Sequence, residues 1–483
     1  MRCRLHHGAQ RALGAAPGTD PGAARGADVL VTTYSTLQRD VERLQAEALP
    51  QFACICLDES QLIKNAASRT AQAVKRLAAA SSCCARVALS GTPVENRLGE
   101  LHSVFDFLNP GLLGARRHFA AAFEQPLKRA QEAQGRWPAE VLERLGRTVA
   151  PFMLRRVKTD ASVAPELPEK LELTHVVSLT PAQSSLYAAV AEEGLRRVRS
   201  PHLGSGDGDG ELTAHEEEVA LGEPSSAVTG AEVRAAPGAG QGTGLQRRRR
   251  ILAVMHGLQQ VCNHPAALPV RSWPSAGAPP REAPECAAVP AASGKTTRLL
   301  ELLEEVLEPL LGEKVLVFTQ YLATLELLAG LVGAAFPAVR VLRFHGAMGA
   351  RERDAAVRAF QEDPACAVML LSLRAGGLGL TLTAATHVVH FDRCWNPARE
   401  AQATDRAHRL GQQRTVVVHR LVTQGTLEER IAAALERKAA LAEAAVQSAG
   451  AVPLLSECSP EELRELLAPC APEPPDEVPA TCR

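Results

Sequence analysis

Short apolar runs alternate with helical segments in two stretches of the sequence, and no other feature restricts the fold as strongly. In the first stretch, within residues 27–93, the apolar runs are ADVLVTTY, FACICLDES and RVALSGTP. In the second, within residues 313–425, they are EKVLVFTQY, VRVLRFHG, CAVMLLS, HVVHFD and TVVVHRLV. Alternation of this kind is typical of parallel sheets with helices on their faces. The sequence therefore predicts an α/β fold with two lobes, each containing a mostly parallel sheet.

Changes in composition divide the chain further. We expect a partial first lobe at residues 1–180, a helical region at 181–292, a second lobe at 293–449, and a short helix with a disordered tail at 450–483. Within the helical region, the Gly-, Ala-, Glu- and Ser-rich residues 201–245 are predicted to be a disordered insertion, and the Pro-rich residues 270–292 a linker. Residues 101–198 are predicted to be mainly helical, and residues 426–449 to form one helix.

Length, charge and cysteine content set the broad class of protein. The 483 residues are enough for two or three domains with full cores. The net charge of −1 indicates that any surface for DNA must be a local basic groove. The twelve cysteines include no C-x-x-C pair, which argues against a zinc site and is typical of a reducing compartment. No apolar stretch is long enough to span a bilayer, so we expect a soluble intracellular protein, nuclear in a eukaryote, with an organelle as an alternative.

Charged and hydroxyl side chains follow two apolar runs of the first lobe. Asp58 and Glu59 end one run, and Ser90, Gly91 and Thr92 end another. Chemistry collects at the carboxyl ends of parallel strands, where an Asp can hold Mg²⁺ and an adjacent Glu can polarise the water that attacks a γ-phosphate. The hydroxyl-rich turn would suit a sensor of the nucleotide state. A helix N-cap and an ordinary β–α turn are the alternative interpretations.

Two arginines lie three residues apart in QATDRAHRLGQQR, residues 402–414. On a helix, Arg406 and Arg409 would share one face. Two guanidinium groups that converge on a phosphate bound by another lobe would be arginine fingers, which stabilise charge in the transition state. A solvated basic helix face is the alternative, although the following Gly and Gln-Gln do not suit a simple salt-bridged surface.

Three glycines in four positions, Gly376, Gly377 and Gly379, follow the run CAVMLLS. They indicate backbone freedom or the close approach of a ligand, and a flexible turn is the alternative. Their spacing, G-G-x-G, does not match the G-x-G-x-x-G of dinucleotide-binding proteins.

The segment SGKTT at residues 293–297 resembles the end of a phosphate-binding loop, but its context argues against that function. Such a loop requires a Gly five residues before Gly294, where Val289 stands. The preceding AVPAA also lacks the strand and the glycine turn. We therefore predict that Lys295 does not bind phosphate.

A series of motifs runs through most of the chain. In order, they are TTYSTL, LDESQLIKN, LSGTPVENRLGELHSVFDFLNPGLLG, PFMLRRVKTD, LPEK, LQQVCNHP, SGK, VLVFTQY, FHG, LLSLRAGGLGLTLTAATHVVHFDRCWNP and QATDRAHRLGQ. This series resembles the Swi/Snf-type helicase-like ATPases of superfamily 2, and most of all their compact bacterial and archaeal subfamily. The resemblance covers residues 5–200 and 246–468.

The resemblance implies two RecA-like lobes with ATP between them and double-stranded DNA across both, with nucleosomes or other DNA-bound proteins as further partners. It assigns Mg²⁺ binding and water activation to Asp58 and Glu59, and the fingers to Arg406 and Arg409. The residues implied in ATP binding or coupling are Gln61, Ser90, Gly91, Thr92, Gly376, Gly377, Gly379 and Gln402. Those implied near the DNA backbone, where hydroxyls and amides hold phosphates without reading bases, are Thr32, Thr33, Thr319, Gln320, His345, Gly346 and Ser372. Arg155, Arg156 and Lys158 resemble the basic stretch at the end of the family's first lobe.

The start of the sequence departs from the family pattern. HHGAQR at residues 6–11 resembles a segment that lies downstream of the phosphate-binding loop in the family. The adenine-contacting motif and the G-x-G-K-T loop would therefore precede residue 1, and we expect lobe 1 to be incomplete. A truncated gene model and a degenerate relative are the two explanations.

Two functions of different classes are compatible with these motifs. One is ATP-driven translocation on double-stranded DNA, in remodelling or repair. The other is a DNA-binding or regulatory module that keeps the fold without ATP turnover. The intact Asp58, Glu59, Arg406 and Arg409 favour descent from the enzyme, whereas the missing phosphate loop predicts little or no hydrolysis by these 483 residues alone.

Overall fold

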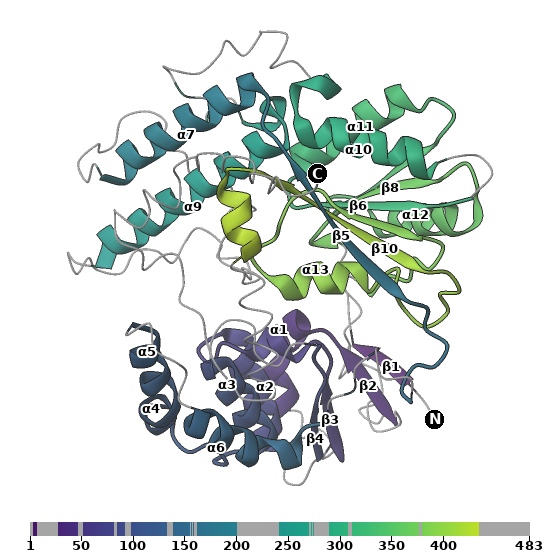
Figure 1. Cartoon of the computed structure of the whole chain (residues 1–483). Coiled ribbons are helices and arrows are strands. Elements are labelled where there is room, and N and C mark those ends of the chain that lie inside the picture. The colour runs from purple at the N-terminus through teal and green to yellow at the C-terminus, as the bar shows by residue number, and fades with distance from the viewer. Residues whose placement is uncertain are drawn as a thin grey trace, which may run out of the picture. The chain divides into compact units, whose positions relative to one another are not determined.

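The computed structural model describes two thirds of the chain (Figure 1). The described residues are 3–6, 28–46, 52–81, 85–91, 98–132, 139–154, 156, 158, 162–199, 241–269, 272, 274, 289–307, 312–375 and 379–433. The predicted disordered insertion up to residue 240, most of the Pro-rich linker and the whole of residues 450–483 lie outside them. None of the described helices is both long and apolar enough to cross a membrane.

Two compact units make up the chain. Unit 1 comprises Met1–Arg155 with Lys438–Pro453, and unit 2 comprises Arg156–Arg437 with Leu454–Arg483. The division falls before the predicted lobe boundary at residue 180, because the strand at residues 170–177 pairs within unit 2.

Unit 1 contains two pairs of parallel strands together with helices (Figure 1). The strands are β1 (Cys3–His6) beside β2 (Val29–Thr32), and β3 (Cys54–Leu57) beside β4 (Ala85–Ala88). The helices are α1 (Tyr34–Ala46), α2 (Arg69–Ala80), α3 (Leu98–Leu108), α4 (Arg116–Phe119), α5 (Gln125–Glu132) and α6 (Ala139–Val149), with the short turns η2 (Ser60–Ile63), η3 (Ala120–Glu124) and η4 (Ala150–Phe152). The predicted strand–helix alternation with parallel pairing is confirmed in this unit.

Helices α1, α2 and α3 pack against one side of the strands of unit 1. Ile63 and Phe107 are fully buried in the core between them. On the strands, by contrast, Leu5 is 68% exposed, Val31 45% and Val87 39%. Unit 1 therefore presents apolar strand side chains to solvent, where a second layer of protein would normally cover a parallel sheet.

Unit 2 is built on a six-stranded sheet in which every neighbouring pair is parallel (Figure 1). The strand order is β5-β10-β9-β6-β8-β7. The strands are β5 (Lys170–Val177), β6 (Val315–Thr319), β7 (Val341–Phe344), β8 (Val368–Ser372), β9 (His387–His390) and β10 (Val416–Thr423). This sheet confirms the predicted α/β fold of the second lobe.

Helices cover both faces of this sheet, which explains why its central strands are continuous apolar runs. All five residues of β6 are buried. On one face, Val315 and Val317 pack against α10 (Gly294–Val306) and α11 (Leu322–Ala335). On the other face, Leu316 and Phe318 belong to the core that includes residues of α12 (Ala350–Glu362) and α13 (Pro397–Thr404).

Two long helices, α7 (Pro181–Arg199) and α9 (Gln241–Asn263), pack against each other in unit 2 (Figure 1). A Cβ on Gly194 would lie 2.5 Å from a methyl group of Val254, so the helices cross where only glycine fits. Their core also takes up Leu427 and Ile431 from residues 427–433, which are helical as predicted for the start of the tail helix.

Three predictions for this unit were wrong. β5 lies in a region that was predicted to be mainly helical. Its sequence KLELTHVV alternates with the period of two that is typical of a strand, and β5 pairs at the edge of the sheet. Residues 241–245, predicted to be irregular, begin α9, whose packing further along the helix outweighs the low helix propensity of its three glycines. The described residues between β8 and β9 contain no long helix, whereas the alternation predicted one.

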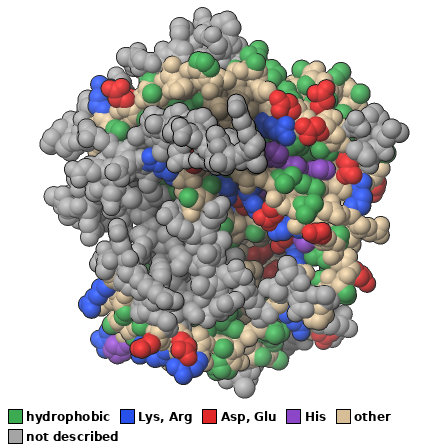
Figure 2. All heavy atoms as spheres, viewed as in Figure 1, with side chains coloured by type: hydrophobic (Ala, Val, Ile, Leu, Met, Phe, Trp, Pro, Cys, Tyr) green, Lys and Arg blue, Asp and Glu red, His purple; other side chains and the backbone are tan. Residues whose placement is uncertain are grey.

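Three histidines form a row across β5, β10 and β9. Ring centroids lie 5.2 Å apart between His175 and His419 and again between His419 and His387. Nε2 of His175 is 2.9 Å from Nδ1 of His419, and Nε2 of His419 is 2.9 Å from Nδ1 of His387. Figure 2 shows histidine side chains (purple) side by side on this face of the protein.

The end of the row determines where each proton lies. Arg298 can only donate, and its Nε is 3.4 Å from Nδ1 of His175, so that nitrogen accepts. In a neutral ring the proton is then on Nε2 of His175, which donates to His419, and His419 donates to His387 in the same way. Burial lowers the pKa of all three rings, and that of His419 to about 3, with His387, His175 and Arg298 adding to the effect.

We predict that unit 2 loses stability as the pH falls below about 6.5. Unfolded histidines take up protons near that pH, whereas folded His419 stays neutral down to about pH 3. The unfolded state therefore binds more protons across this window, and the free energy of unfolding decreases as the pH falls. The check is the melting temperature as a function of pH, which should be less steep in His419→Gln. His118→Gln, at an exposed position, is the control variant. Equal slopes of melting temperature against pH for His419→Gln and wild type would contradict the prediction.

Candidate functional site

Asp58 and Glu59 lie directly after β3, at the carboxyl end of a parallel strand. Asp58 is exposed, and its Oδ1 accepts a hydrogen bond from the backbone N of Glu59 at 3.0 Å. The hydroxyl of Tyr34 donates to the Asp58 carbonyl at 2.7 Å. Burial raises the pKa of Tyr34 most, and the nearby charge of Asp58 raises it further. The backbone at the strand end is thus fixed, while the Asp58 side chain remains accessible.

Glu59 has a left-handed backbone, with φ 50° and ψ 52°. No other non-glycine residue in the described part of the chain has a positive φ. This conformation costs an L-residue about 1–2 kcal/mol and persists where surrounding contacts impose it, which is common at functional sites. Here the next residue is held, because Ser60 N donates to the carbonyl of Leu89 at 2.8 Å.

A chain of hydrogen bonds connects Glu59 with the hydroxyl turn after β4. Gln61 Nε2 donates to Glu59 Oε2 at 2.5 Å, and Ser90 Oγ donates to Gln61 Oε1 at 3.0 Å. The side-chain amide of Gln61 thus bridges the ends of β3 and β4, because its nitrogen donates to Glu59 and its oxygen accepts from Ser90. A Cβ added to Gly91 would have no neighbour within 4 Å, and Thr92 lies outside the described residues.

We predict that Glu59→Gly is more stable than Glu59→Ala by about 1 kcal/mol. Both variants lose the carboxylate and its bond to Gln61, so their difference isolates the strain of a side chain at positive φ. Chemical denaturation of the two variants measures it. The same pair of substitutions at Glu42, in the interior of α1, should favour Ala, because glycine destabilises a helix. Equal stability of the two Glu59 variants would mean that the residue is not strained.

Arg406 and Arg409 lie in a turn after α13, and the prediction that they share a helix face was wrong. α13 begins where Asn396 accepts from Ala398 N with Pro397 in the first turn, and it ends at Thr404. The carbonyl of Arg406 accepts from Leu382 N at 2.9 Å, which removes it from the helical pattern. Arg406 is buried, whereas Arg409 is exposed.

The arginine turn, residues 405–411, packs against the segment that follows the glycines. Besides the bond from Leu382 to Arg406, the buried Gln412 donates Nε2–H to the carbonyls of Thr383 at 3.0 Å and Ala385 at 2.8 Å. Gly379 has φ +27°, a conformation that L side chains rarely adopt. Gly376 and Gly377 lie outside the described residues, and Gln402, in α13, is half-buried. Two motifs that are distant in sequence are therefore adjacent in unit 2.

The two halves of the predicted ATP site belong to different units. Asp58 and Glu59 are in unit 1, and Arg406 and Arg409 are in unit 2. Their convergence on one nucleotide stays a prediction.

The hydroxyls predicted to lie near DNA in unit 1 have partners within the fold. Thr33 Oγ1 accepts from Thr36 N at 3.3 Å, as a cap at the start of α1. Thr32 Oγ1 donates to the carbonyl of His6 at 3.1 Å. Any contact of these residues with DNA would compete with these bonds, and their DNA-binding role stays a prediction.

The residues of unit 2 predicted to lie near DNA differ in accessibility. Thr319 and Gln320 are buried, and Gln320 Nε2 donates to the carbonyl of Arg393 at 2.9 Å. The His345 side chain is 20% exposed, and Gly346 has no neighbour within 4 Å of an added Cβ. Ser372 is half-buried, and its Oγ accepts from the N of Ala375 at 3.3 Å. His345 and Gly346 are therefore the more accessible members of this set.

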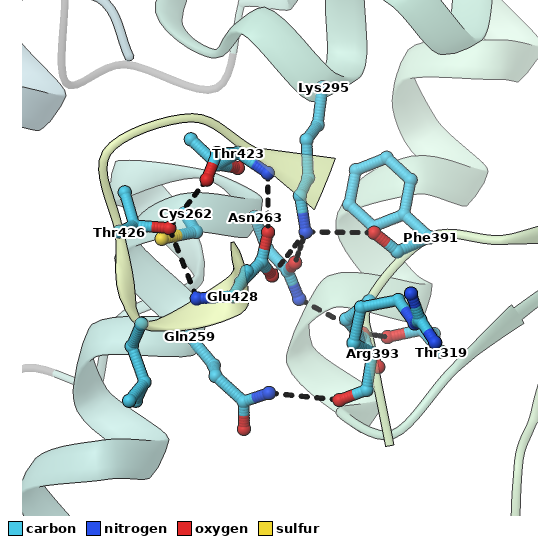
Figure 3. Close-up of polar contacts among 12 residues, drawn as sticks. Gln259, Cys262, Asn263, Lys295, Thr319, Phe391, Arg393, Thr423, Thr426 and Glu428 are labelled. Atoms are coloured by element: carbon cyan, nitrogen blue, oxygen red, sulfur yellow. Dashed lines mark hydrogen bonds and ion pairs between the residues drawn. The ribbon is translucent and has the colours of Figure 1, made fainter. Parts of the chain in front are cut away.

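Lys295 is fully buried and uses all three of its N–H groups within the protein (Figure 3). Its Nζ donates to Glu428 Oε1 at 2.5 Å, to the Phe391 carbonyl at 2.9 Å and to Asn263 Oδ1 at 3.1 Å. An ammonium group has three donors, so none remains for a phosphate. These contacts support the prediction that Lys295 does not bind phosphate.

The buried network around Lys295 extends to the end of β6 (Figure 3). Asn263 Nδ2 donates to Asp392 Oδ2 at 3.0 Å, and Asp392 also accepts from Gln320 N at 3.0 Å and from the hydroxyl of Thr319. Burial raises the pKa of Asp392, and Lys295 with the donors opposes that effect. The network therefore joins the end of α9, the start of α10 and the ends of β6 and β9.

Sequence reasoning missed Asn263, Asp392 and Glu428 as members of this network. Their signal was a polar residue next to an apolar run, as in QQVCNHP, VVHFD and TLEER. Such residues are either exposed or buried with partners, and only the fold distinguishes the two cases.

We predict that Lys295→Met lowers the free energy of unfolding by about 3–5 kcal/mol, because it leaves the carboxylate of Glu428 buried without its partner. Chemical denaturation provides the measurement. Lys170→Met is the matched control, since Lys170 and Glu172 form an ion pair in which each side chain is 38% exposed. That control should lose less than about 1 kcal/mol. Similar losses in both variants would contradict the prediction.

Two family profiles match consecutive stretches of the chain, and the first extends across the boundary between the two units. The profile of the SNF2-related domain matches residues 7–267, and that of the Helicase conserved C-terminal domain matches residues 295–411. The chain belongs to the SNF2-related family. The resemblance inferred from the motifs is thereby confirmed.

Individual SNF2 relatives are longer than this sequence. It is 34% identical over 466 residues to the Bacillus subtilis (strain 168) protein named "Putative ATP-dependent helicase/translocase YwqA", covering 96% of this chain and 42% of that protein. It is 32% identical over 429 residues to the TATA-binding protein-associated factor 172 of Homo sapiens, covering 84% and 21%. Among solved structures, it is similar to the Sulfolobus solfataricus SWI2/SNF2 ATPase core domain, with 29% identity, a TM-score of 0.45, and coverage of 98% of this chain and 80% of that one. The chain spans less than half the length of the two relatives.

Proposed function

We propose that this SNF2-family chain is the motor core of an ATP-dependent translocase on double-stranded DNA, in nucleoprotein remodelling or DNA repair. The observation that carries the proposal is the bonded chain Glu59–Gln61–Ser90, which begins at the strained Glu59. A carboxylate held in one orientation at a strand end suits a group that positions and polarises a water molecule. Its link to Ser90 gives that carboxylate a connection to a second strand end.

Asp58 suits the Mg²⁺ that accompanies ATP. Magnesium in nucleotide sites is held by one or two carboxylates together with phosphates and waters, so a single accessible carboxylate is sufficient. Asp58 meets this requirement because it is exposed. Its position is fixed because its carboxylate accepts from Glu59 N and its carbonyl accepts from the Tyr34 hydroxyl. The bound ion would neutralise charge on the phosphates. Asp58 would hold it, and Glu59 would orient the attacking water.

The arginine turn would supply the positive charge that balances the transferred phosphoryl group. Arg409 is exposed and available to a ligand, and Arg406 is buried beside the segment after the glycines. The backbone bonds at Leu382 and Gln412 would keep this turn in place during the reaction. Catalysis of phosphoryl transfer depends on such positioning more than on covalent chemistry.

DNA would be held through its phosphates. Thr32 and Thr33 in unit 1, and His345, Gly346 and Ser372 in unit 2, lie at or next to strand ends, where backbone amides and hydroxyls gather. Contacts of this kind position a duplex without reading its sequence. A translocase needs that property, because it must pass over every sequence that it meets. The compartment would be one that contains DNA.

A polypeptide of residues 1–483 alone should hydrolyse ATP poorly. The β- and γ-phosphates must be held before the carboxylates and arginines can act, and the sequence contains no complete G-x-x-x-x-G-K-[ST] segment. The exposed Leu5, Val31 and Val87 would also lower its solubility. DNA binding would be weaker but present, and would decrease steeply with salt.

We predict low ATP turnover for residues 1–483, and DNA-stimulated turnover for the product of the complete coding sequence if it supplies a G-x-G-K-T segment upstream. Glu59→Gln should lower that turnover by about 10²-fold or more, because the water loses its base. A coupled ATPase assay with and without duplex DNA measures both. Glu42→Gln, which changes an exposed carboxylate of unit 1, should leave turnover unchanged.

Two outcomes would contradict this proposal. Robust DNA-stimulated turnover by residues 1–483 that Glu59→Gln abolishes would mean that other residues hold the phosphates. A complete product that binds duplex DNA but never hydrolyses ATP would favour the alternative, a DNA-binding or regulatory relative.

A further inference from the structure

The segment that leads from unit 1 into β5 contacts the arginine turn directly. Lys158, three residues after Arg155, where the first stretch of unit 1 ends, forms an ion pair with Asp405 Oδ1 at 2.7 Å. The same Nζ donates to the carbonyl of His408 at 2.9 Å. One ammonium group thus binds the residue before Arg406 and the residue before Arg409.

A second contact joins the same two parts of the chain. His408 is buried, and its Nε2 lies 2.9 Å from the carbonyl of Pro168. A carbonyl can only accept, so Nε2 of His408 carries the proton and donates. Lys158 and Pro168 therefore hold the turn from the side of the connecting segment, whose described residues are 156, 158 and 162–169.

Contacts from outside the arginine turn add to its own backbone hydrogen bonds, such as that from His408 N to the carbonyl of Thr404 at 3.0 Å. The backbone of the turn is not helical, and on its other side the carbonyl of Arg406 accepts from Leu382 N. The arginine turn is thus held between the segment after the glycines and the connecting segment. Displacement of either one would move the backbone of Arg406 and Arg409.

The Lys158 contact contributes little to the stability of the fold. The side chain of Lys158 is 43% exposed and that of Asp405 is 48% exposed. Ion pairs this accessible to water contribute little to the stability of a protein. Substitution of Lys158 should therefore leave unit 2 folded, which makes it a clean probe of function.

We propose that Lys158 is a positioning residue for ATP hydrolysis, which holds the arginine turn to the connecting segment and so ties the fingers to the chain that leaves unit 1. The inference rests on the proposed function. Lys158 touches neither nucleotide nor water in this role, and acts through the turn. Because phosphoryl transfer is sensitive to displacements of the order of 1 Å, a loosened turn lowers the rate of the chemical step more than it lowers substrate binding.

The test compares Lys158→Ala with wild type in the product of the complete coding sequence. We expect kcat for DNA-stimulated ATP hydrolysis to decrease about tenfold, while KM for ATP and the affinity for duplex DNA change by less than about twofold. Lys158→Arg keeps the positive charge and can still donate to both Asp405 and the carbonyl of His408, so it should restore most of the rate. Lys170→Ala is the control, because Lys170 also forms a half-exposed ion pair in unit 2 but its partner is Glu172.

A second measurement reads the turn itself. Hydrogen–deuterium exchange of the backbone amides at residues 402–414 should be faster in Lys158→Ala than in Lys170→Ala. Wild-type kcat together with wild-type exchange in Lys158→Ala would overturn the proposal, as would equal losses in the two variants. If the wild-type protein itself shows no DNA-stimulated turnover, the proposed function fails. The exchange result then decides by itself whether Lys158 holds the turn.

Discussion

The rest of unit 2 depends on the parallel pairing of β5 with β10, which joins two strands that are far apart in the sequence. It runs over eight residue pairs, from Lys170 beside Val416 to Val177 beside Thr423. Side chains reinforce it, since Arg420 Nη1 donates to Glu172 Oε2 at 2.7 Å. Although burial opposes it, hydrogen bonds from Arg420 and Lys170 lower the pKa of Glu172 to about 2. The pairing places the connecting segment beside the arginine turn.

Buried polar residues then fix how the layers of unit 2 meet. Lys295 joins α10 to the segment after β10, and Asn263 joins α9 to Asp392 at the end of β9. Such groups are costly to bury, and the cost is offset only when every donor and acceptor is satisfied in one arrangement. The network thus favours one relative placement of these elements over others that would bury the same apolar area. Thr319 and Gln320 take their positions from it.

Much of this fold could be predicted from sequence, because strands buried on both faces form continuous apolar runs. β6 and β8 follow that rule. Asp58 and Glu59 were found because they directly follow an apolar run, although Cys54 and Cys56 in that run are exposed. β5 escaped prediction because an edge strand with charged and apolar residues in alternation lacks that signal.

The parts of the site that depend on tertiary contacts could not be predicted. The turn at Arg406 combines local backbone bonds with one to a distant N–H group, that of Leu382, which donates to the Arg406 carbonyl. The left-handed backbone of Glu59 is likewise invisible in sequence, since residues at positive φ are usually glycine. Local patterns therefore identified the residues, whereas their conformation came from partners far along the chain.

The histidine row has a consequence for how β5 finds its alignment during folding. Leu171, Leu173 and Val176 are 43%, 47% and 59% exposed, so hydrophobic burial distinguishes weakly between alternative alignments of this edge strand. A slip of two residues would keep each side chain on its own face of the sheet. A slip that sets Leu171 beside His419 would nevertheless carry His175 away from His419 and leave a ring nitrogen of His419 without its partner. The row penalises this misalignment, at the strand where the apolar pattern does so least.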